Sequence, residues 1–235
     1  MKMYSGHLSV VAILENDKRE VQELFINKSK RSKIIAYALS LAYQKQIKIN
    51  ILSDKEFKML NIENSGGIAC LASVQKPFLT KKDAKLILLI EGVEDPYNVG
   101  NLIRSAYISG FDAVCFDKKR FELYDDVILR SSAGCFDRLL IYDLELLDEL
   151  VSYGYNFVAL HRSNHSILLN DFDCNKLPLV LCVGGEKRGL SKKVLNYCNE
   201  HVLLENFSDL GLAYSSVAAG AIAMYYIGNK LNKEK

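Results

Sequence analysis

The sequence contains little proline and no compositionally biased segment. It has 3 prolines and 14 glycines among 235 residues, and 49% of the residues are hydrophobic. Disordered chains are poorer in apolar residues and fibrous chains are strongly repetitive, so the composition excludes both classes. A chain of this length forms one large domain or two small ones.

Long apolar segments are also absent. The longest begin near Leu86 and Val217, and both are shorter than the ~20 residues that a membrane-spanning helix needs. The N-terminal residues lack the basic start, long apolar core and small-residue cleavage site of a secretory signal. We therefore expect a cytoplasmic protein without a membrane partner.

The cysteines and histidines follow no redox or metal-binding pattern. No Cys-x-x-Cys pair occurs, so we expect reduced thiols. His161 and His165 have the spacing of half a zinc finger, but no cysteine pair precedes them, and the sequence predicts no metal site. Cys70, Cys115 and Cys182 lie in apolar segments, which favours small core residues over nucleophiles.

The net charge of +2 hides a difference between the two ends of the chain. Residues 1–80 contain 12 Lys and Arg against 7 Asp and Glu, and residues 81–85 contain 3 against 1. Residues 86–235 contain 15 against 20, so the chain begins basic and ends acidic. Clustered positive charge suits a polyanion such as RNA, although a solvated helix surface accounts for a modest excess equally well.

The first eighty residues are typical of a small α/β unit. Helical spacing predicts helices over residues 7–15, 33–46 and 56–60, with Asp54 as the cap of the last. Apolar segments predict strands over residues 21–27, 47–52 and 67–74. Residues 75–85 are polar, basic and interrupted by a proline, as in a linker.

From residue 86 onward, short apolar segments alternate with helical ones. Strands are predicted over residues 86–91, 112–116, 138–143, 155–161, 177–184 and 201–205. This alternation favours a mostly parallel sheet with helices on both faces. Ligands bind outside the carboxyl ends of such strands, so we expect the site in the loops that follow residues 91, 184 and 205.

The first of these loops leads into a helix. Asp95-Pro96 favours a turn, Asn98 is a candidate cap of a helix over residues 99–109, and Gly110 ends that helix. Arg104 would then lie within reach of the strand ends. The alternative interpretation is a capped helix with a surface arginine.

The second loop contains Gly184, Gly185 and Gly189 around a charged turn, and Ser191 caps the following helix. Glycines at a strand end let a ligand approach the backbone closely. The loop matches neither Gly-x-Gly-x-x-Gly nor a Walker motif, so a dinucleotide or triphosphate site is not supported. Glu186 is either a ligand of a hydroxyl or an arginine, or a surface acid.

The third loop leads into a helix that begins with small residues at 216–223. Small side chains let a neighbouring backbone approach closely. This approach suits either the core of the domain or a subunit interface.

Together, the three loops resemble the signature motifs of the SpoU/TrmH family of SPOUT-class RNA methyltransferases. The segment DPYNVGNLIRSA (residues 95–106) is similar to motif 1, with Asn98 and Arg104 at its asparagine and arginine. The segment LVLCVGGEKRGLS (residues 179–191) is similar to motif 2, with Glu186 and Gly189 in place. SSAGC at residues 131–135 matches a small-residue segment that many members carry between these motifs.

The resemblance extends over the whole chain and implies a fold and a reaction. The fold is α/β, of SPOUT type: a mostly parallel sheet with a C-terminal trefoil knot, preceded by a small α/β/α substrate-binding domain. The implied organisation is an RNA-binding domain at 1–76, a linker at 77–85 and a methyltransferase domain at 86–235. The implied reaction is methyl transfer from the cofactor S-adenosyl-L-methionine to a ribose 2′-hydroxyl of RNA, with ribosomal RNA as the favoured substrate. The resemblance also implies a homodimer and no metal.

The resemblance also assigns roles to residues. Arg104, Asn98 and Glu186 would be catalytic: Arg104 activates or orients the hydroxyl, and Glu186 positions Arg104 or the substrate. A covalent intermediate is not needed, because a sulfonium methyl group is already activated. The residues that would hold the cofactor are Gly184, Gly185, Glu186, Gly189, Leu204, Leu212 and Ser216.

Motif 3 departs from the family pattern. Leu212 and Tyr214 stand where the family has a serine and an asparagine, so other residues must supply those polar groups. Three alternatives therefore stay open: an RNA-binding protein with a degenerate, non-catalytic domain, a methyltransferase directed to tRNA, and a nucleotide-dependent enzyme of another kind. The absence of phosphate-loop motifs counts against the last.

Overall fold

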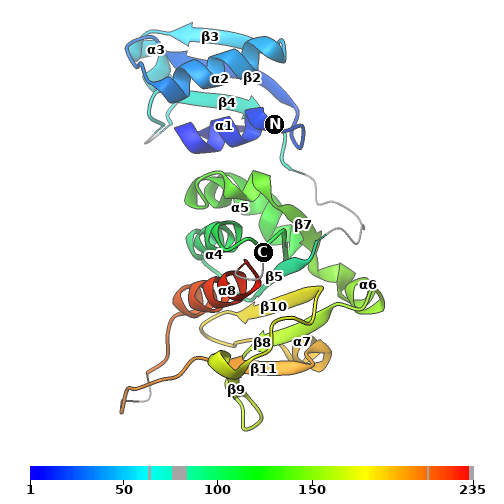
Figure 1. Cartoon of the computed structure of the whole chain (residues 1–235). Helices are drawn as coiled ribbons and strands as arrows, with labels where there is room; N and C mark the ends of the chain where they lie inside the picture. Colours follow the sequence, from blue (N-terminus) through cyan, green and yellow to red (C-terminus); the bar gives the residue numbers. More distant parts are fainter. Residues whose placement is uncertain (63–64, 76–83, 211, 233–235) are drawn as a thin grey trace. The chain divides into compact units, whose positions relative to one another are not determined.

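The computed structural model describes residues 1–62, 65–75, 84–210 and 212–232 (Figure 1). The chain forms two compact units. Unit 1 contains Met1–Lys76 and Tyr124–Arg138, and unit 2 contains Pro77–Leu123 and Leu139–Lys235. Within the described ranges, no helix is both long and apolar enough to cross a membrane. The predicted linker at 77–85 lies outside the described residues, except for Ala84 and Lys85.

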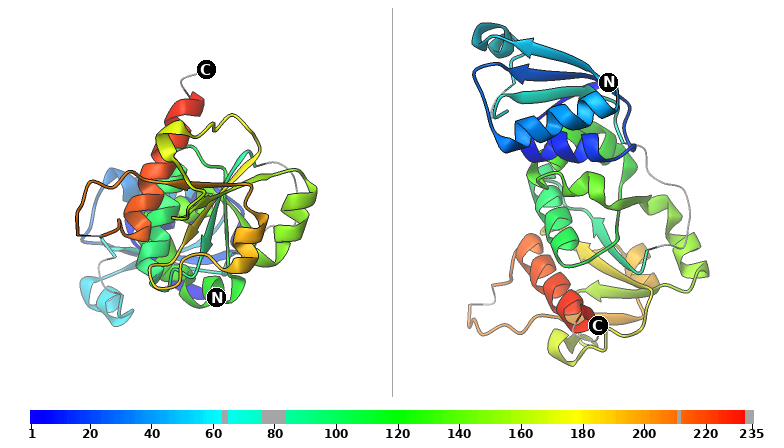
Figure 2. Two further views of the ribbon diagram at one scale, coloured as in Figure 1. Left: turned by 90° about the horizontal axis from the view of Figure 1, so that it is seen from below. Right: turned by 45° about the horizontal axis from the view of Figure 1, so that its top comes forward.

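Unit 1 is built on a four-stranded mixed sheet. Its strands are β1 (Lys2–Ser5), β2 (Val21–Asn27), β3 (Lys48–Leu52) and β4 (Ile68–Ala72), in the order β1-β4-β2-β3. β2 and β3 are parallel, whereas β4 is antiparallel to both of its neighbours. The helices α1 (His7–Glu15) and α2 (Lys33–Gln44) pack against each other on one face of this sheet (Figure 2).

The short helix α3 (Asp54–Met59) follows β3 and corrects the predicted cap. The N-cap is Ser53: its side-chain oxygen accepts a bond from the Glu56 amide, and the Glu56 carboxylate accepts one from the Ser53 amide. Such a capping box satisfies amides that the first helical turn leaves without a partner. Asp54 instead accepts bonds from Asn27 and Ser29 at the end of β2.

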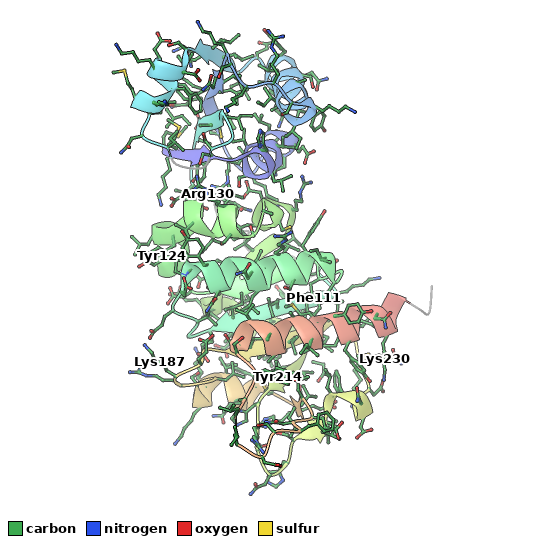
Figure 3. The ribbon with its side chains drawn as sticks, turned by 90° about the vertical axis from the view of Figure 1, so that its left-hand side faces the viewer. Phe111, Tyr124, Arg130, Lys187, Tyr214 and Lys230 are labelled. Carbon is green, nitrogen blue, oxygen red and sulfur yellow. The ribbon has the colours of Figure 1, made fainter. Side chains whose placement is uncertain are left out.

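The chain returns to unit 1 after residue 123. Helix α5 (Lys118–Ser131) has non-helical dihedral angles at Tyr124, where the division between the units falls (Figure 3). The 3-10 helix η1 (Cys135–Arg138) packs on α1, and a Cβ on Gly134 would lie 2.6 Å from the Leu8 carbonyl oxygen. The sequence predicted a continuous second domain from residue 86, whereas the contacts group Tyr124–Arg138 with the first unit.

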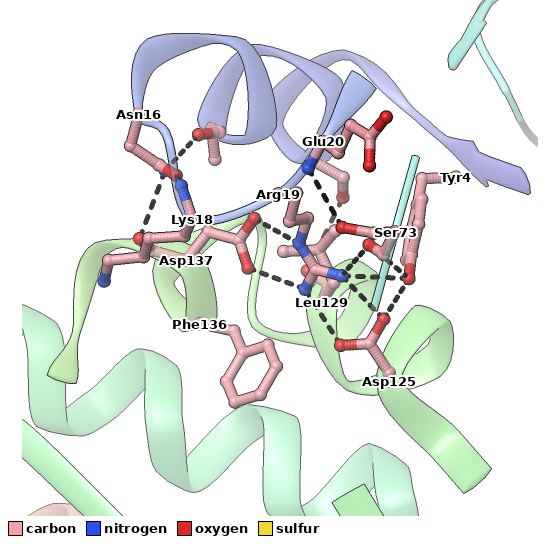
Figure 4. Close-up of polar contacts among 12 residues, drawn as sticks. Tyr4, Asn16, Lys18, Arg19, Glu20, Ser73, Asp125, Leu129, Phe136 and Asp137 are labelled. Carbon is pink, nitrogen blue, oxygen red and sulfur yellow. Dashed lines mark hydrogen bonds and ion pairs between the residues drawn. The ribbon is translucent and has the colours of Figure 1, made fainter. Parts of the chain in front are cut away.

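A buried ion cluster fixes this segment to the N-terminal residues (Figure 4). The Arg19 guanidinium donates paired hydrogen bonds of 2.7–2.9 Å to the carboxylates of Asp125 and Asp137. These three side chains are completely buried. The Tyr4 hydroxyl accepts a bond from Arg19 at 2.9 Å and donates one to Asp125. Because removing one partner of a buried ion pair is strongly destabilising, the cluster holds residues 124–138 in unit 1.

Unit 2 contains a seven-stranded sheet in which all neighbours are parallel. Its strands are β5 (Leu86–Glu91), β6 (Ala113–Phe116), β7 (Leu140–Asp143), β8 (Asn156–Leu160), β9 (Ile167–Leu168), β10 (Leu179–Gly184) and β11 (Glu200–Leu203). They lie in the order β7-β6-β5-β10-β8-β11-β9. The predicted α/β fold with a mostly parallel sheet is confirmed.

Helices cover both faces of this sheet (Figure 2). One face carries α4 (Pro96–Ile108) and α8 (Ser216–Asn232), the other α6 (Leu147–Ser152) and α7 (Lys192–Tyr197), and the 3-10 helices η2 (Leu144–Leu146) and η3 (Leu169–Asp171) lie in the connections. Ile87 and Leu89 of β5 pack in the core with Val194 of α7. On the other face, a Cβ on Gly220 of α8 would lie 2.6 Å from the Leu102 side chain of α4, so these two helices approach closely.

Candidate functional site

The three predicted loops leave unit 2 at one edge of its sheet. Because neighbouring strands are parallel, the loops after β5, β10 and β11 start at the same edge, together with the loop after β8. β10 lies between β5 and β8, and β11 is the next strand beyond β8. The loops that carry the predicted site residues are therefore neighbours in space.

The loop after β5 leads into α4, whose cap differs from the predicted one. Asp95 is the N-cap: its carboxylate accepts a bond from the Tyr97 amide at 2.9 Å, and Pro96 takes the first helical position. The prediction of Asn98 as cap is wrong, because Asn98 lies half-buried within the helix, and proline is favoured directly after a cap. Arg104 is exposed and forms no hydrogen bond or ion pair with a described residue.

The glycines after β10 are required by backbone packing. The Gly185 amide donates to the Glu91 carbonyl oxygen at 2.8 Å, and a Cβ on Gly185 would lie 2.0 Å from the Gly92 carbonyl oxygen. A Cβ on Gly184 would lie 2.4 Å from the Gly189 carbonyl carbon. Gly185 thus brings the first and second loops into contact, and Gly184 lets the second loop fold back on Gly189, at the place where the sequence predicted room for a ligand.

Glu186 and Ser216 join the second loop to the third. The Ser216 hydroxyl donates to Glu186 Oε1 at 2.6 Å, across 30 residues of sequence. This bond is the main cause of the lowered pKa of Glu186, against which burial and Glu94 act. Glu186 is exposed, so its carboxylate is a fixed anion open to solvent rather than a base with a raised pKa. The structure thus brings together two of the predicted site residues.

Further polar contacts hold the second loop against the first. The amide and the hydroxyl of Ser191 donate to the Glu91 carboxylate at 2.7 and 2.8 Å. Ser191 also caps α7, as predicted. Lys187 and Glu94 form an exposed ion pair at 2.9 Å. These contacts orient the turn that carries Glu186.

A cavity of about 410 Å³ opens at the ends of β8 and β11. Its walls are mainly apolar, with Leu160, Leu168 and Val202 among them. The polar residues that line it are His161, Arg162, Glu205, Asn206 and Tyr214, the last of which lies just before α8 (Figure 3). Small-molecule sites typically have volumes of roughly 300–1,000 Å³ and this mixture of apolar walls and few polar groups.

Of the described residues that were predicted to hold the cofactor, only one lines the cavity. Leu204 lines it, whereas Gly184, Gly185, Glu186 and Gly189 belong to the loop after β10, and Ser216 begins α8. Leu212 is 63% exposed, and its carbonyl oxygen accepts a bond from the Asn206 side chain.

His161 and Arg162 line the cavity but were not predicted as site residues. They follow β8, which lies between β10 and β11. The strand itself was predicted. Because ligands bind at the carboxyl ends of neighbouring strands, the loop after β8 would have been included in the predicted site if the strand order had been known. The ring of His161 lies edge-on to that of His201, with a distance of 5.6 Å between centroids. Burial lowers the pKa of His201, and His161 lowers it further.

The described thiols do not form part of this site. All six cysteines are free. Burial raises the pKa of Cys70 to about 12 and also raises the pKa values of Cys115 and Cys182, so these thiols stay protonated and unreactive. Within the described part of the chain, no three His, Cys, Asp or Glu side chains are arranged to hold a metal ion.

Comparisons with known sequences find relatives of this chain. A sequence model of the SpoU rRNA Methylase family matches residues 85–225. A protein of Staphylococcus haemolyticus, named for the TrmH family of tRNA/rRNA methyltransferases, is 26% identical over 154 residues, which cover 64% of this chain and 61% of that protein. The chain thus spans about three-fifths of the length of the curated relatives it matches.

Solved structures share the fold. The SpoU methyltransferase AviRb from Streptomyces viridochromogenes has a TM-score of 0.81 and 18% identity, over 99% of this chain and 90% of its own. Its complex with the cofactor AdoMet has a TM-score of 0.77 and 19% identity, over 98% and 90%. A structure named RNA 2′-O ribose methyltransferase has a TM-score of 0.77 and 20% identity, over 98% and 88%.

Proposed function

Because this chain belongs to the SpoU rRNA methylase family, we propose that it transfers a methyl group from S-adenosyl-L-methionine to a ribose 2′-hydroxyl of RNA, with ribosomal RNA as its substrate. The observation that carries this proposal is that the matched residues 85–225 include the three loops at the carboxyl edge of the sheet and the cavity beside them. The neighbour solved with AdoMet supports the choice of cofactor, and the one named for 2′-O ribose methylation supports the choice of target atom.

The cavity beside these loops is the proposed cofactor site. Its apolar walls suit an adenine ring, while Arg162 and Glu205 suit the carboxylate, ammonium or ribose hydroxyl groups of the same molecule. Leu204 contributes to the wall, and the turn with Gly184 and Gly185 follows the adjacent strand. When bound, the cofactor supplies a methyl group that is already activated.

Arg104 and Glu186 would align the ribose. A guanidinium stays protonated in proteins, so Arg104 suits binding of the 2′-oxygen and would offset negative charge there as the hydroxyl proton passes to solvent water. Glu186 is held by Ser216 and has a lowered pKa, so it would fix Arg104 or a ribose hydroxyl rather than accept that proton. Asn98, in the first turn of α4, would contact the ribose or its phosphate.

A homodimer is part of the proposal. Exposed apolar side chains lie on the adjacent helices α4 and α8: Tyr97, Tyr107, Ile108, Ile222 and Tyr225 are each at least 41% exposed. Arg104 lies four residues before Ile108 and shares its face of α4. A second copy on this surface would bury the apolar side chains and bring Arg104 to the interface.

The remaining features follow from family membership and are proposed on that ground. They are a C-terminal trefoil knot in the methyltransferase domain at 86–235, an RNA-binding role for residues 1–76, and a cytoplasmic location. The basic charge of the first eighty residues supports the second of these.

Methylation of defined RNAs tests the proposal. The protein is incubated with labelled S-adenosylmethionine and unmodified ribosomal RNA or tRNA, and methylated riboses are found as sites that resist alkaline cleavage. Arg104→Ala should lower the rate by about 10²–10³-fold, as the loss of one oxyanion-stabilising donor does. Arg138→Ala, at an arginine of unit 1 that pairs with Glu15, is the control and should stay active. Absence of ribose methylation in every RNA, or full activity of Arg104→Ala, would contradict the mechanism.

A second candidate is an RNA-binding protein that no longer methylates. It is favoured by Leu212 and Tyr214, which replace polar family residues next to the cavity. Calorimetry that detects RNA binding but no S-adenosylmethionine binding would support it. The staphylococcal relative is named for both tRNA and rRNA, so a tRNA substrate is the other possibility. The RNA that becomes methylated in the first experiment distinguishes a tRNA methyltransferase from an rRNA methyltransferase.

A further inference from the structure

Six exposed cations of unit 1 form no ion pair with a described residue. We call them the basic edge: Lys28, Lys30, Arg31 and Lys33 between β2 and the first turn of α2, and Lys55 and Lys58 on α3. Lys45 and Lys48 of the same unit, by contrast, pair with Asp17 and Glu23 at 2.8 Å. Asp54 and Glu56 of α3 lie near Lys30, Lys58 and Lys28 and offset part of this charge, so the basic edge offers a partner a net positive charge.

The fold brings the two segments of the basic edge together. β2 and β3 are parallel neighbours, so the chain leaves both strands at the same edge of the sheet. The Asn27 amide and the Ser29 hydroxyl donate to the same oxygen of Asp54, each at 2.7 Å. These two bonds are the main causes of the lowered pKa of Asp54, and Lys58 and Lys30 lower it further. One carboxylate thus ties the segments together and lies near cations from both.

Local contacts fix the conformation of residues 28–33. The Ser29 amide donates to the Asn27 side-chain oxygen at 2.9 Å, and the Lys30 amide donates to the Asn27 carbonyl oxygen at 3.0 Å. A Cβ on Gly67 would lie 2.5 Å from Lys30 Cγ, so the lysine stem packs against the glycine. Ser32 caps α2. Several cations carried on a fixed backbone favour an extended polyanion that neutralises more than one of them at once.

An aromatic side chain lies beside these cations. Tyr37 is 47% exposed and lies four residues after Lys33 on α2, so both side chains share one face of the helix. Proteins that bind single-stranded nucleic acid combine such parts, since cations bind phosphates and aromatic rings stack on bases.

We propose that the basic edge binds the phosphate backbone of RNA and that Tyr37 stacks on an unpaired base next to it. The proposal rests on the RNA substrate of the proposed function, and it assigns capture of that substrate to one edge of the unit 1 sheet. An acidic peptide would meet the same cations, but it has no base for Tyr37 to stack on.

Salt-dependent binding tests the proposal. Full-length protein is titrated against a fluorescein-labelled RNA stem-loop with a single-stranded tail at several salt concentrations. Lys30→Ala/Arg31→Ala should reduce the slope of log affinity against log salt by about 1.4–1.8, since each phosphate contact contributes about 0.7–0.9. Tyr37→Ala should weaken binding by roughly 5- to 150-fold without changing the slope, because stacking releases no counterions.

Lys45→Ala/Lys48→Ala is the matched control. It removes the same charge from the same unit, but at cations that already pair with acids near the opposite end of β3. Its slope should equal that of the wild type. Equal losses in both double variants, or an unchanged slope in Lys30→Ala/Arg31→Ala, would overturn the proposal. Equally tight, Tyr37-independent binding of a polyglutamate peptide would also overturn it.

Cofactor binding separates this proposal from the proposed function. Calorimetry with S-adenosylmethionine is run on the same variants, and their melting temperatures are compared with that of the wild type. RNA binding that depends on the basic edge, without cofactor binding, would contradict the proposed methyltransferase function and support the proposed RNA-binding surface. RNA methylation together with an unaltered salt slope in Lys30→Ala/Arg31→Ala would support the proposed function and contradict the proposed RNA-binding surface.

Discussion

The buried ion cluster of unit 1 allows a direct test of how residues 124–138 are held. In Arg19→Met, Asp125 and Asp137 would stay buried without a counter-ion, since all three side chains are completely buried in the native chain. Removing one partner of a buried pair typically costs about 3–5 kcal/mol. We expect unit 1 to lose this much of its free energy of unfolding, a large part of the total of about 5–15 kcal/mol that a domain has.

The loss should depend on pH with a definite sign. Burial raises the pKa of Asp137 above its ordinary value and Arg19 opposes that rise, so loss of Arg19 should raise this pKa further above the value in the unfolded chain. Groups with a raised pKa stabilise the folded state at low pH, and this contribution is lost as pH rises through the folded pKa. Protonation of Asp137 restores about 1.4 kcal/mol per pH unit as the pH falls from its folded pKa to its unfolded pKa. The variant should therefore lose less near pH 5 than near pH 7.

Hydrogen exchange with mass spectrometry is the suitable assay, because the chain contains no tryptophan and the method reads the two units separately. Amides of β4 report on unit 1, and those of β10 report on unit 2. The control Lys48→Met removes an exposed pair with Glu23 and should leave the free energy of unfolding of unit 1 nearly unchanged. A similarly small effect of Arg19→Met, or a loss that is equal at both pH values, would refute the reasoning.

Ser216→Ala should raise the pKa of Glu186 toward its ordinary value, because the main hydrogen bond to the carboxylate is lost; carboxyl NMR titration measures this, and an unchanged pKa would contradict the assigned cause. Gly185→Ala should lower the free energy of unfolding of unit 2 by about 1–3 kcal/mol or more, because the added methyl group would overlap the backbone. Gly154→Asn, where nothing lies within 4 Å and only the left-handed backbone (φ 77°) opposes a side chain, should cost less, and equal losses would argue against overlap as the cause. Iodoacetamide near neutral pH should label Cys198 before Cys115, because burial raises the pKa of Cys115; peptide mapping that finds the opposite order would contradict this.

The strands could be predicted from the sequence more reliably than the helix caps. Buried parallel strands appear as short apolar segments, and each predicted strand of the second half overlaps an observed one. Asn98 and Asp54 have good capping side chains, but Asp95 and Ser53 take the caps. Pro96 after Asp95 favoured the observed choice, so in that case the signal was local and was given too little weight.

The site was only partly predictable, because it depends on which strand ends are neighbours. The motif loops identified Glu186 and Ser216, which do meet. His161 and Arg162 reach the cavity only because β8 lies between β10 and β11, and no local pattern specifies that order. The ion cluster was beyond prediction for the same reason, since Arg19 and Asp125 are 106 residues apart in sequence.

Unit 1 is assembled from two separate parts of the chain, so the chain passes between the units at residues 76–77, 123–124 and 138–139. A fragment that starts at residue 86 would keep Asp125 and Asp137 but lose Arg19. Its two carboxylates, which are buried in the full chain, would then lack their counter-ion. Cleavage between β4 and β5 would not release residues 1–76, because the ion cluster would hold them to the other fragment. In this respect unit 1 resembles a two-piece complementation system whose pieces are made on one polypeptide.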